Sequence, residues 1–124
     1  MAANKDPQSV LPHHHGEVKE KILDDMPCQA AILSVSDVLK QLGDPSRLKI
    51  FWLLCHCEEC VINIAALAEM SSPAVSHHLR LLKASGLIVS RRNGKEMYYR
   101  AADTDMVKSL HKTIEHIADI ACPG

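Results

Sequence analysis

The sequence predicts a mainly α-helical fold in which one helix is followed directly by a β-hairpin. Three observations within residues 71–100 predict it: a helical segment with one apolar and one polar face, strand-favouring runs on both sides of Asn93-Gly94, and basic residues gathered near that turn. A helix beside a basic hairpin is typical of a winged helix-turn-helix, in which both elements contact DNA.

The segments before this helix are expected to be an arm and four helices. Residues 1–16 are predicted to form a flexible arm that carries His13, His14 and His15, and residues 17–124 one folded domain with a short polar helix over 17–25. A better helix opens at Pro27 and ends at Gly43. Its apolar residues recur at helical spacing: Cys28, Ile32, Val35, Leu39 and Leu42.

Two further helices complete the part that precedes the recognition helix. Asp44-Pro45 is expected to cap the first, whose apolar stripe includes Leu48, Phe51 and Leu54. Asn63 is expected to cap the second, which runs through residue 70 and would be the positioning helix of the helix-turn-helix.

The recognition helix is expected over about 73–84. Pro73 suits a first helical position, Ser72 can cap the helix, and Gly86 can close its far end in a left-handed conformation. At 100° per residue one face seats the helix and the other points outward. The seating residues are Val75, Leu79 and Leu82, and the outward residues are Ser76, His77 and Arg80.

The hairpin follows at once, with one strand over 87–91, a turn at Asn93-Gly94 and a return strand over 95–100. This geometry places basic side chains at the hairpin tip. The residues expected to contact DNA are Ser72, Ser76, His77, Arg80, Arg91, Arg92 and Lys95.

The distribution of charge supports this prediction. The chain has a formal net charge of −1, yet residues 72–100 hold six basic residues and one acid, a net of +5, so the remainder carries −6. A basic patch on an acidic body is the electrostatic pattern of a phosphate-binding surface. The alternative is an ordinary solvated charged surface.

The last helix is expected over about 104–121. Its apolar residues alternate spacings of three and four: Val107, Leu110, Ile114, Ile117 and Ala121. Such a stripe at the end of a chain of 124 residues predicts a packing seam with a second copy. We therefore expect a homodimer that forms through the terminal helices.

Composition indicates the cellular compartment of the protein and the redox state of its cysteines. No apolar run approaches the roughly 20 residues of a membrane span, and the polar residues 1–10 are not typical of a secretory signal. We expect a cytoplasmic protein with no membrane partner. Five cysteines without framework spacing favour reduced thiols or metal ligands over disulfides.

Several motifs resemble one family in their order and spacing. They are Asp44-Pro45-Ser46-Arg47-Leu48, Glu59-Cys60-Val61, the run from Ser76 to Leu82, and the basic hairpin. Together they resemble the ArsR/SmtB family of winged-helix, metal-responsive repressors, over about residues 13–121. The resemblance implies a homodimer that binds an inverted-repeat operator when metal-free and releases it when an inducer binds.

The resemblance implies two candidate sensing sites. The first lies on paired C-terminal helices, where the family's positions are occupied by Asp103, Asp105, His116 and Asp119. Asp105 replaces the usual histidine and Asp119 the usual Glu or His, so the set has one imidazole and three carboxylates. The alternative is a group of solvated polar residues in which Asp103 caps the helix.

The second site would join the N-terminal arm to the start of the helix-turn-helix. Cys60 stands at the family's cysteine position, Asn63 replaces the acidic ligand, and arm ligands could be His13, His14 and His15. Cys57 and Cys60 are open to a ligand or redox role. For Cys28 and Cys55 packing is the better interpretation, and His56, His78 and His111 are left as surface or satisfied histidines.

The favoured function is therefore a metal-responsive transcriptional repressor, not an enzyme, whose divalent ion is zinc, with cadmium or another soft metal as a possibility. One alternative keeps the same repressor but gives it a cysteine-based inducer site for arsenite, persulfide or an oxidant. A remote alternative is a thiol redox enzyme that uses Cys57 and Cys60 with His56.

Overall fold

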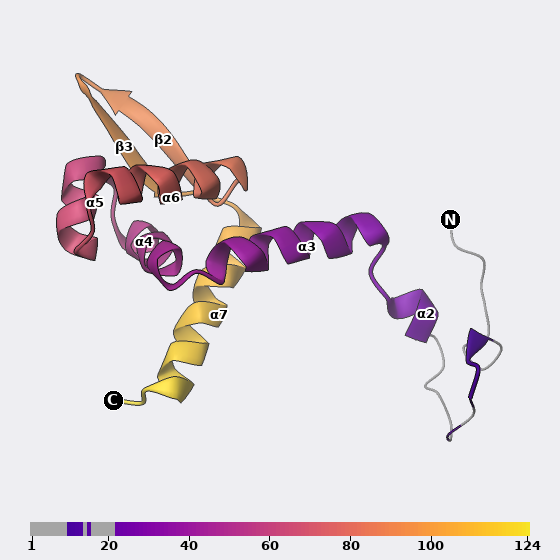
Figure 1. The fold of residues 1–124 in the computed structure, drawn as a ribbon. Coiled ribbons are helices and arrows are strands. Elements are labelled where there is room, and N and C mark those ends of the chain that lie inside the picture. Colours follow the sequence, from indigo (N-terminus) through magenta and orange to yellow (C-terminus); the bar gives the residue numbers. More distant parts are fainter. Residues whose placement is uncertain (1–9, 14, 16–21) are drawn as a thin grey trace. The chain divides into compact units, whose positions relative to one another are not determined.

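The computed structural model describes residues 10–13, 15 and 22–124 (Figure 1). They divide into two compact units, Met1–Val35 and Ser36–Gly124. The first unit contains α2 (Ile22–Asp25) and the start of α3 (Gln29–Leu42). Of the helix expected over 17–25, residues 17–21 lie outside the described part of the chain, as does His14, whereas His13 and His15 stack with ring centroids 5.5 Å apart.

The second unit confirms the mainly α-helical fold with a β-hairpin wing. After the end of α3 it contains α4 (Pro45–His56), β1 (Glu59–Cys60), α5 (Val61–Ala68), α6 (Ser72–Ala84), β2 (Ile88–Asn93), β3 (Glu96–Ala101) and α7 (Asp105–Ala121). In Figure 1, α5 and α6 form the helix-turn-helix, and the hairpin of β2 and β3 projects beside α6.

One hydrophobic core holds these elements together. Its fully buried side chains include Phe51 of α4, Ile64 of α5 and Leu79 of α6, and Val107 of α7 closes it at 3% exposed. Burying such a side chain contributes about 1.5–3 kcal/mol. The predicted seating face of α6 is confirmed, because Val75, Leu79 and Leu82 are all buried.

The helix caps differ from two of the expectations. Asp44 caps α4 as expected, accepting from the backbone N–H of Arg47 at 2.9 Å. Ser71, not Ser72, caps α6 through the N–H of Ala74, because helix α6 begins one residue earlier than expected. Cys60 occupies the cap position of α5, and Asn63 lies inside that helix, where its amide donates to Glu59.

The hairpin turn is also shifted by one residue. Asn93 pairs with Glu96, so the two-residue loop is Gly94-Lys95 and not Asn93-Gly94. Gly94 takes a φ of +66°, which suits glycine at the first position of a type II′ turn. Strand β1 was not predicted. It pairs with Tyr98 and Tyr99 and makes β3 the central strand of a three-stranded sheet.

The apolar stripes of α3 and α7 are only partly buried in one chain. On α3, Val38 is buried, whereas Ile32, Val35 and Leu39 are exposed. The seam expected along α7 needs correction, because its first half packs on the chain's own core: Val107, Leu110 and Ile114. Its outward side includes Ile117 at 57% and Ile120 at 68% exposed. Within the described residues no helix is long and apolar enough to cross a membrane.

Candidate functional site

The outward face of α6 is polar and accessible. Ser72, Ser76, His77 and Arg80 are all exposed, as expected for groups that meet a nucleic acid. They are fixed in place because Val75, Leu79 and Leu82, on the opposite face, are locked into the core. A buried stripe of this kind gives the exposed side chains a defined height and rotation about the helix axis.

The wing extends this surface with two exposed cations, Arg92 and Lys95. Between α6 and the wing, the Lys83 ammonium donates to the Ser90 hydroxyl at 2.7 Å. The hairpin is thereby joined to the C-terminal turn of α6 by a side-chain hydrogen bond as well as by Gly86, which takes a φ of +74°.

Arg91 behaves differently from the other basic residues at the tip. Its guanidinium forms a bidentate pair with Glu58, with a shortest distance of 2.6 Å, and lies over the Tyr98 ring at 5.3 Å from the centroid. The hydrogen bond from Arg91 lowers the pKa of the Glu58 carboxyl. Arg91 therefore fastens the wing to the segment after α4, and the predicted contact of Arg91 with DNA would compete with this pair.

His78, next to the exposed His77, is turned inward. Its Nδ1 atom is buried without a hydrogen-bond partner, and its Nε2 atom lies 3.9 Å from an oxygen of Asp44. Burial lowers the pKa of His78. The sequence predicted that His78 is a surface histidine or one with satisfied hydrogen bonds. This prediction is wrong, because Nδ1 is buried and has no hydrogen-bond partner.

The first predicted metal set lies along α7 and the residues before it. Asp103, Asp105, His116 and Asp119 are all exposed. Asp103 pairs with Lys108 at 3.2 Å, and the cap of α7 is Thr104, not Asp103. A site shared by two protomers is not assembled within one chain, so this metal site stays a prediction.

The second predicted set is spread over different environments. Cys57 is half-buried with its thiol 3.4 Å from the Leu53 carbonyl, and Cys60 is buried in β1. Burial raises the pKa of Cys57, and burial together with the charge of Glu115 raises the pKa of Cys55 to about 11. Since the thiolate is the nucleophile and the ligand, both thiols are held in their less reactive form.

The structure brings together three side chains that the sequence did not connect. His56 at the end of α4 meets His111 and Glu115 of α7, with ligand-capable atoms of all three within 4.8 Å of one another. His111 and Glu115 are four residues apart, a helical spacing that was available as a signal. No spacing rule relates either of them to His56, because that contact depends on how α4 and α7 pack.

Comparison with known proteins gives consistent matches. A model of the family described as "Bacterial regulatory protein, arsR family" matches residues 44–90. A transcriptional repressor SmtB homolog from Synechocystis sp. is 34% identical over 85 residues, and this chain spans 64% of its length. A cadmium resistance transcriptional regulatory protein CadC homolog from Staphylococcus aureus is 37% identical over 93 residues, 74% of this chain and 77% of that protein.

A solved structure supports the fold. The solution NMR structure of a homodimeric winged helix-turn-helix DNA-binding domain from Mycobacterium bovis, a possible ArsR-family regulator, is 33% identical. It superposes with a TM-score of 0.66 over 84% of this chain and 89% of that one.

Proposed function

The chain belongs to the ArsR family of bacterial regulatory proteins, and on that premise we propose that it is a homodimeric, metal-responsive transcriptional repressor. In this proposal the metal-free dimer binds an operator in double-stranded DNA, and a divalent ion such as zinc or cadmium releases it. The protein would act in the cytoplasm as a binding protein and not as an enzyme.

The observation that carries DNA binding is the division of α6 into two faces beside a basic wing. Ser76, His77 and Arg80 are exposed on α6, and a helix of this kind can enter the major groove and reach base edges. Arg92 and Lys95 are exposed on the wing and would neutralise phosphates. Contacts to phosphates carry no sequence information but fix the orientation of the protein on the duplex.

Dimer formation is supported by apolar surface that one chain leaves uncovered. Leu39 on α3 is 58% exposed, and Ile117 and Ile120 on α7 are exposed to a similar degree or more. The related M. bovis domain is described as homodimeric. Pairing of two copies over α7 would also bring a second set of C-terminal ligands to the same place.

We propose Asp103, Asp105, His116 and Asp119 as the regulatory metal site, shared between two protomers. The names of the relatives, a repressor SmtB homolog and a cadmium resistance regulator, support a metal as the inducer. Three carboxylates and one imidazole can bind zinc. Because the set contains no thiolate, it should not strongly prefer soft ions. The cysteine-based alternative is less favoured, because the pKa values of Cys55 and Cys57 are raised.

The test begins with duplex DNA selected from a random pool by the metal-free protein and followed by fluorescence anisotropy. Zinc should weaken binding by roughly 5–150-fold, the usual range of allosteric coupling, and His116→Ala should remove this response while leaving metal-free binding intact. A His116→Ala protein that releases the DNA at the same zinc concentration as the unaltered protein would contradict the regulatory assignment.

The DNA surface is tested on the same duplex and on a scrambled one. His77→Ala should reduce the preference for the selected sequence by roughly 1–3 kcal/mol if the imidazole reads a base. Arg92→Ala should instead weaken binding to both duplexes by a similar factor, because phosphate contacts are independent of sequence. Unchanged binding by both variants, when folded, would reject this surface.

A further inference from the structure

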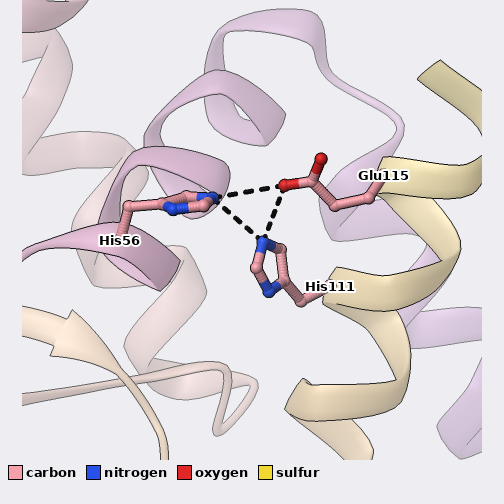
Figure 2. A group of neighbouring side chains, drawn as sticks. All are labelled: His56, His111 and Glu115. Atoms are coloured by element: carbon pink, nitrogen blue, oxygen red, sulfur yellow. Dashed lines mark hydrogen bonds and ion pairs between the residues drawn. The ribbon is translucent and has the colours of Figure 1, made fainter. Parts of the chain in front are cut away.

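The cluster formed by His56, His111 and Glu115 has an unusually closed geometry (Figure 2). The Nε2 atoms of the two histidines are 3.0 Å apart, and Oε1 of Glu115 lies 3.2 Å from His56 and 3.0 Å from His111. Two nitrogens and one oxygen thus form a nearly equilateral triangle that joins the end of α4 to α7.

With Glu115 ionised, no placement of protons on the two histidines satisfies all three sides of this triangle. Each Nε2 atom carries either one hydrogen or one lone pair, and an ionised carboxylate oxygen only accepts. If both histidines donate to Glu115, two N–H groups face each other across 3.0 Å. If only one nitrogen is protonated, the other nitrogen and the carboxylate oxygen meet as two acceptors. A cation in place of the protons would turn all three lone pairs into favourable contacts.

The dimensions fit a small divalent cation. Zinc binds histidine nitrogen and carboxylate oxygen at about 2.0–2.1 Å, and tetrahedral geometry then separates neighbouring ligand atoms by about 3.3 Å. The three observed separations of 3.0–3.2 Å need to open by only a few tenths of an ångström. Three protein ligands also leave one position for solvent or another ligand, as in open zinc sites.

The surroundings support a carboxylate that is ready to bind. The indole N–H of Trp52 donates to Oε1 of Glu115 at 2.9 Å, and the Trp52 ring lies 4.2 Å from that of His56. A metal ligand that is oriented by an outer hydrogen bond is the usual arrangement in metalloproteins. The side chains are 28–44% exposed, so an ion can enter from solvent.

We propose that His56, His111 and Glu115 form a second metal site, complete within one protomer, for zinc or a similar borderline divalent ion. It goes beyond the proposed function, which places the regulatory ion between two protomers. The two sites share no ligand. Around α7, His116 lies about 100° from Glu115, whereas Asp119 lies about 40° from it and one turn further along the helix.

An ion at this site would connect α4 to α7 directly. His56 is the last residue of α4 and is followed by Cys57, Glu58 and the β1 strand that pairs with the wing. Glu58 itself binds Arg91 of the wing. The ion would therefore hold the end of α4 against the helix that we assign to dimer formation, close to the segment that fastens the wing.

Trp52, the one tryptophan of the chain, provides a local readout. Zinc should change its fluorescence in a saturable way at one ion per chain in the unaltered full-length protein. His56→Ala and Glu115→Gln should each weaken the binding of the zinc ion that causes this change. The loss in affinity should be at least the 10–100-fold that removal of an outer hydrogen-bond partner costs. His116→Ala is the matched control on α7 and should keep the unaltered response.

A monomeric variant separates this site from the shared one. Ile117→Asp, which we expect to dissociate the dimer, should still show the Trp52 response, because all three ligands belong to one chain. Circular dichroism establishes that each variant is folded. If Ile117→Asp does not fold, the comparison of His56→Ala with His116→Ala still shows which residues bind the ion that changes Trp52 fluorescence. Loss of the zinc-driven DNA release in His116→Ala, with the Trp52 response retained, would support both proposals independently.

Cobalt provides a check that does not use fluorescence. Co²⁺ bound to the three side chains should give the intense visible absorption of a four-coordinate site, and Trp52→Phe should weaken its binding by about 10–100-fold, because Glu115 loses its outer hydrogen bond. The proposal is overturned if zinc leaves Trp52 fluorescence unchanged, if His56→Ala and Glu115→Gln respond as the unaltered protein does, or if His116→Ala abolishes the response.

Discussion

Helices α6 and α7 are both anchored in the same core, but they present opposite kinds of surface to the outside. The seating residues Leu79 of α6 and Val107 of α7 are almost completely buried. The outward face of α6 is polar and includes His77 and Arg80, whereas that of α7 includes Ile117 and Ile120. On α6 the apolar stripe is the seated side, whereas on α7 apolar residues continue onto the exposed side. The composition of the exposed side therefore indicates what each helix meets: a polyanion for α6 and another protein surface for α7.

The largest effect is expected at the outward face of α7. Ile117→Asp would place a charge in the seam between two protomers, where an unpaired charge costs several kcal/mol. The protein should sediment as a monomer, and operator binding should collapse because a dimer is needed to span two half-sites. Lys112→Asp, on an exposed position of the same helix, should remain dimeric. A dimeric Ile117→Asp protein with normal DNA affinity would show that the exposed apolar side of α7 is not the dimer interface.

The seated face of α6 is tested by a pair of leucines. Leu79→Ala removes a side chain that is 2% exposed and should lower the free energy of unfolding by about 2–5 kcal/mol. Leu67→Ala, at the 55% exposed Leu67 of α5, should change it by less than about 0.5 kcal/mol. Urea unfolding measures both at the same protein concentration, because a dimer's stability depends on concentration. Equal losses would mean that Leu67 is covered in the assembled protein.

The caps of the two helices should contribute similar, smaller amounts. Ser71→Ala and Thr104→Ala remove the acceptors for the N–H groups of Ala74 and Val107, and each should cost about 1 kcal/mol. Ser72→Ala should cost less, since Ser72 is the first residue of α6 and not its cap. If urea unfolding shows a larger loss of stability for Ser72→Ala than for Ser71→Ala, Ser72 is the cap of α6, as the sequence predicted.

The smallest effect is expected at the wing, through the ionisation of Glu58. Its hydrogen bond with Arg91 lowers the pKa of Glu58 below the ordinary value of 4.5. The stabilisation is therefore fully present above pH 4.5 and is lost as the pH falls through the lower, folded-state pKa. Glu58→Gln should unfold with a shallower dependence on pH below this value in urea titrations. Identical pH profiles would show that the pair contributes nothing to stability.

Much of the fold could be predicted because its signals are local. The two faces of α6, the Asp44 cap and the left-handed Gly86 each depend on residues a few positions apart, and all three are confirmed. The errors at Ser72 and at the hairpin turn are shifts of one residue, where neighbouring serines or an Asn-Gly pair offer two registers of similar quality. Only the full packing of the helix and the strand pairing decides between them.

The parts that could not be predicted depend on contacts between distant segments. β1 has two residues, too few for any strand pattern, and exists because Glu59 and Cys60 lie beside β3. Likewise, His56 lies 55 positions before His111, and the two meet only because α4 and α7 pack together. Ligands that are supplied by another element leave no periodic trace in the sequence.

The pairing of Arg91 with Glu58 has a consequence for the counter-ions of DNA. Each phosphate that a protein neutralises adds about 0.9 to the slope of log affinity against log salt concentration. A cation that already has a carboxylate partner, as Arg91 has in Glu58, displaces no net counter-ion unless the ion pair dissociates. Arg100 also lies near Glu58, at 3.8 Å. The salt dependence of this protein should therefore reflect the other four cations of α6 and the wing, Arg80, Lys83, Arg92 and Lys95, and be less steep than the six basic residues of this region suggest.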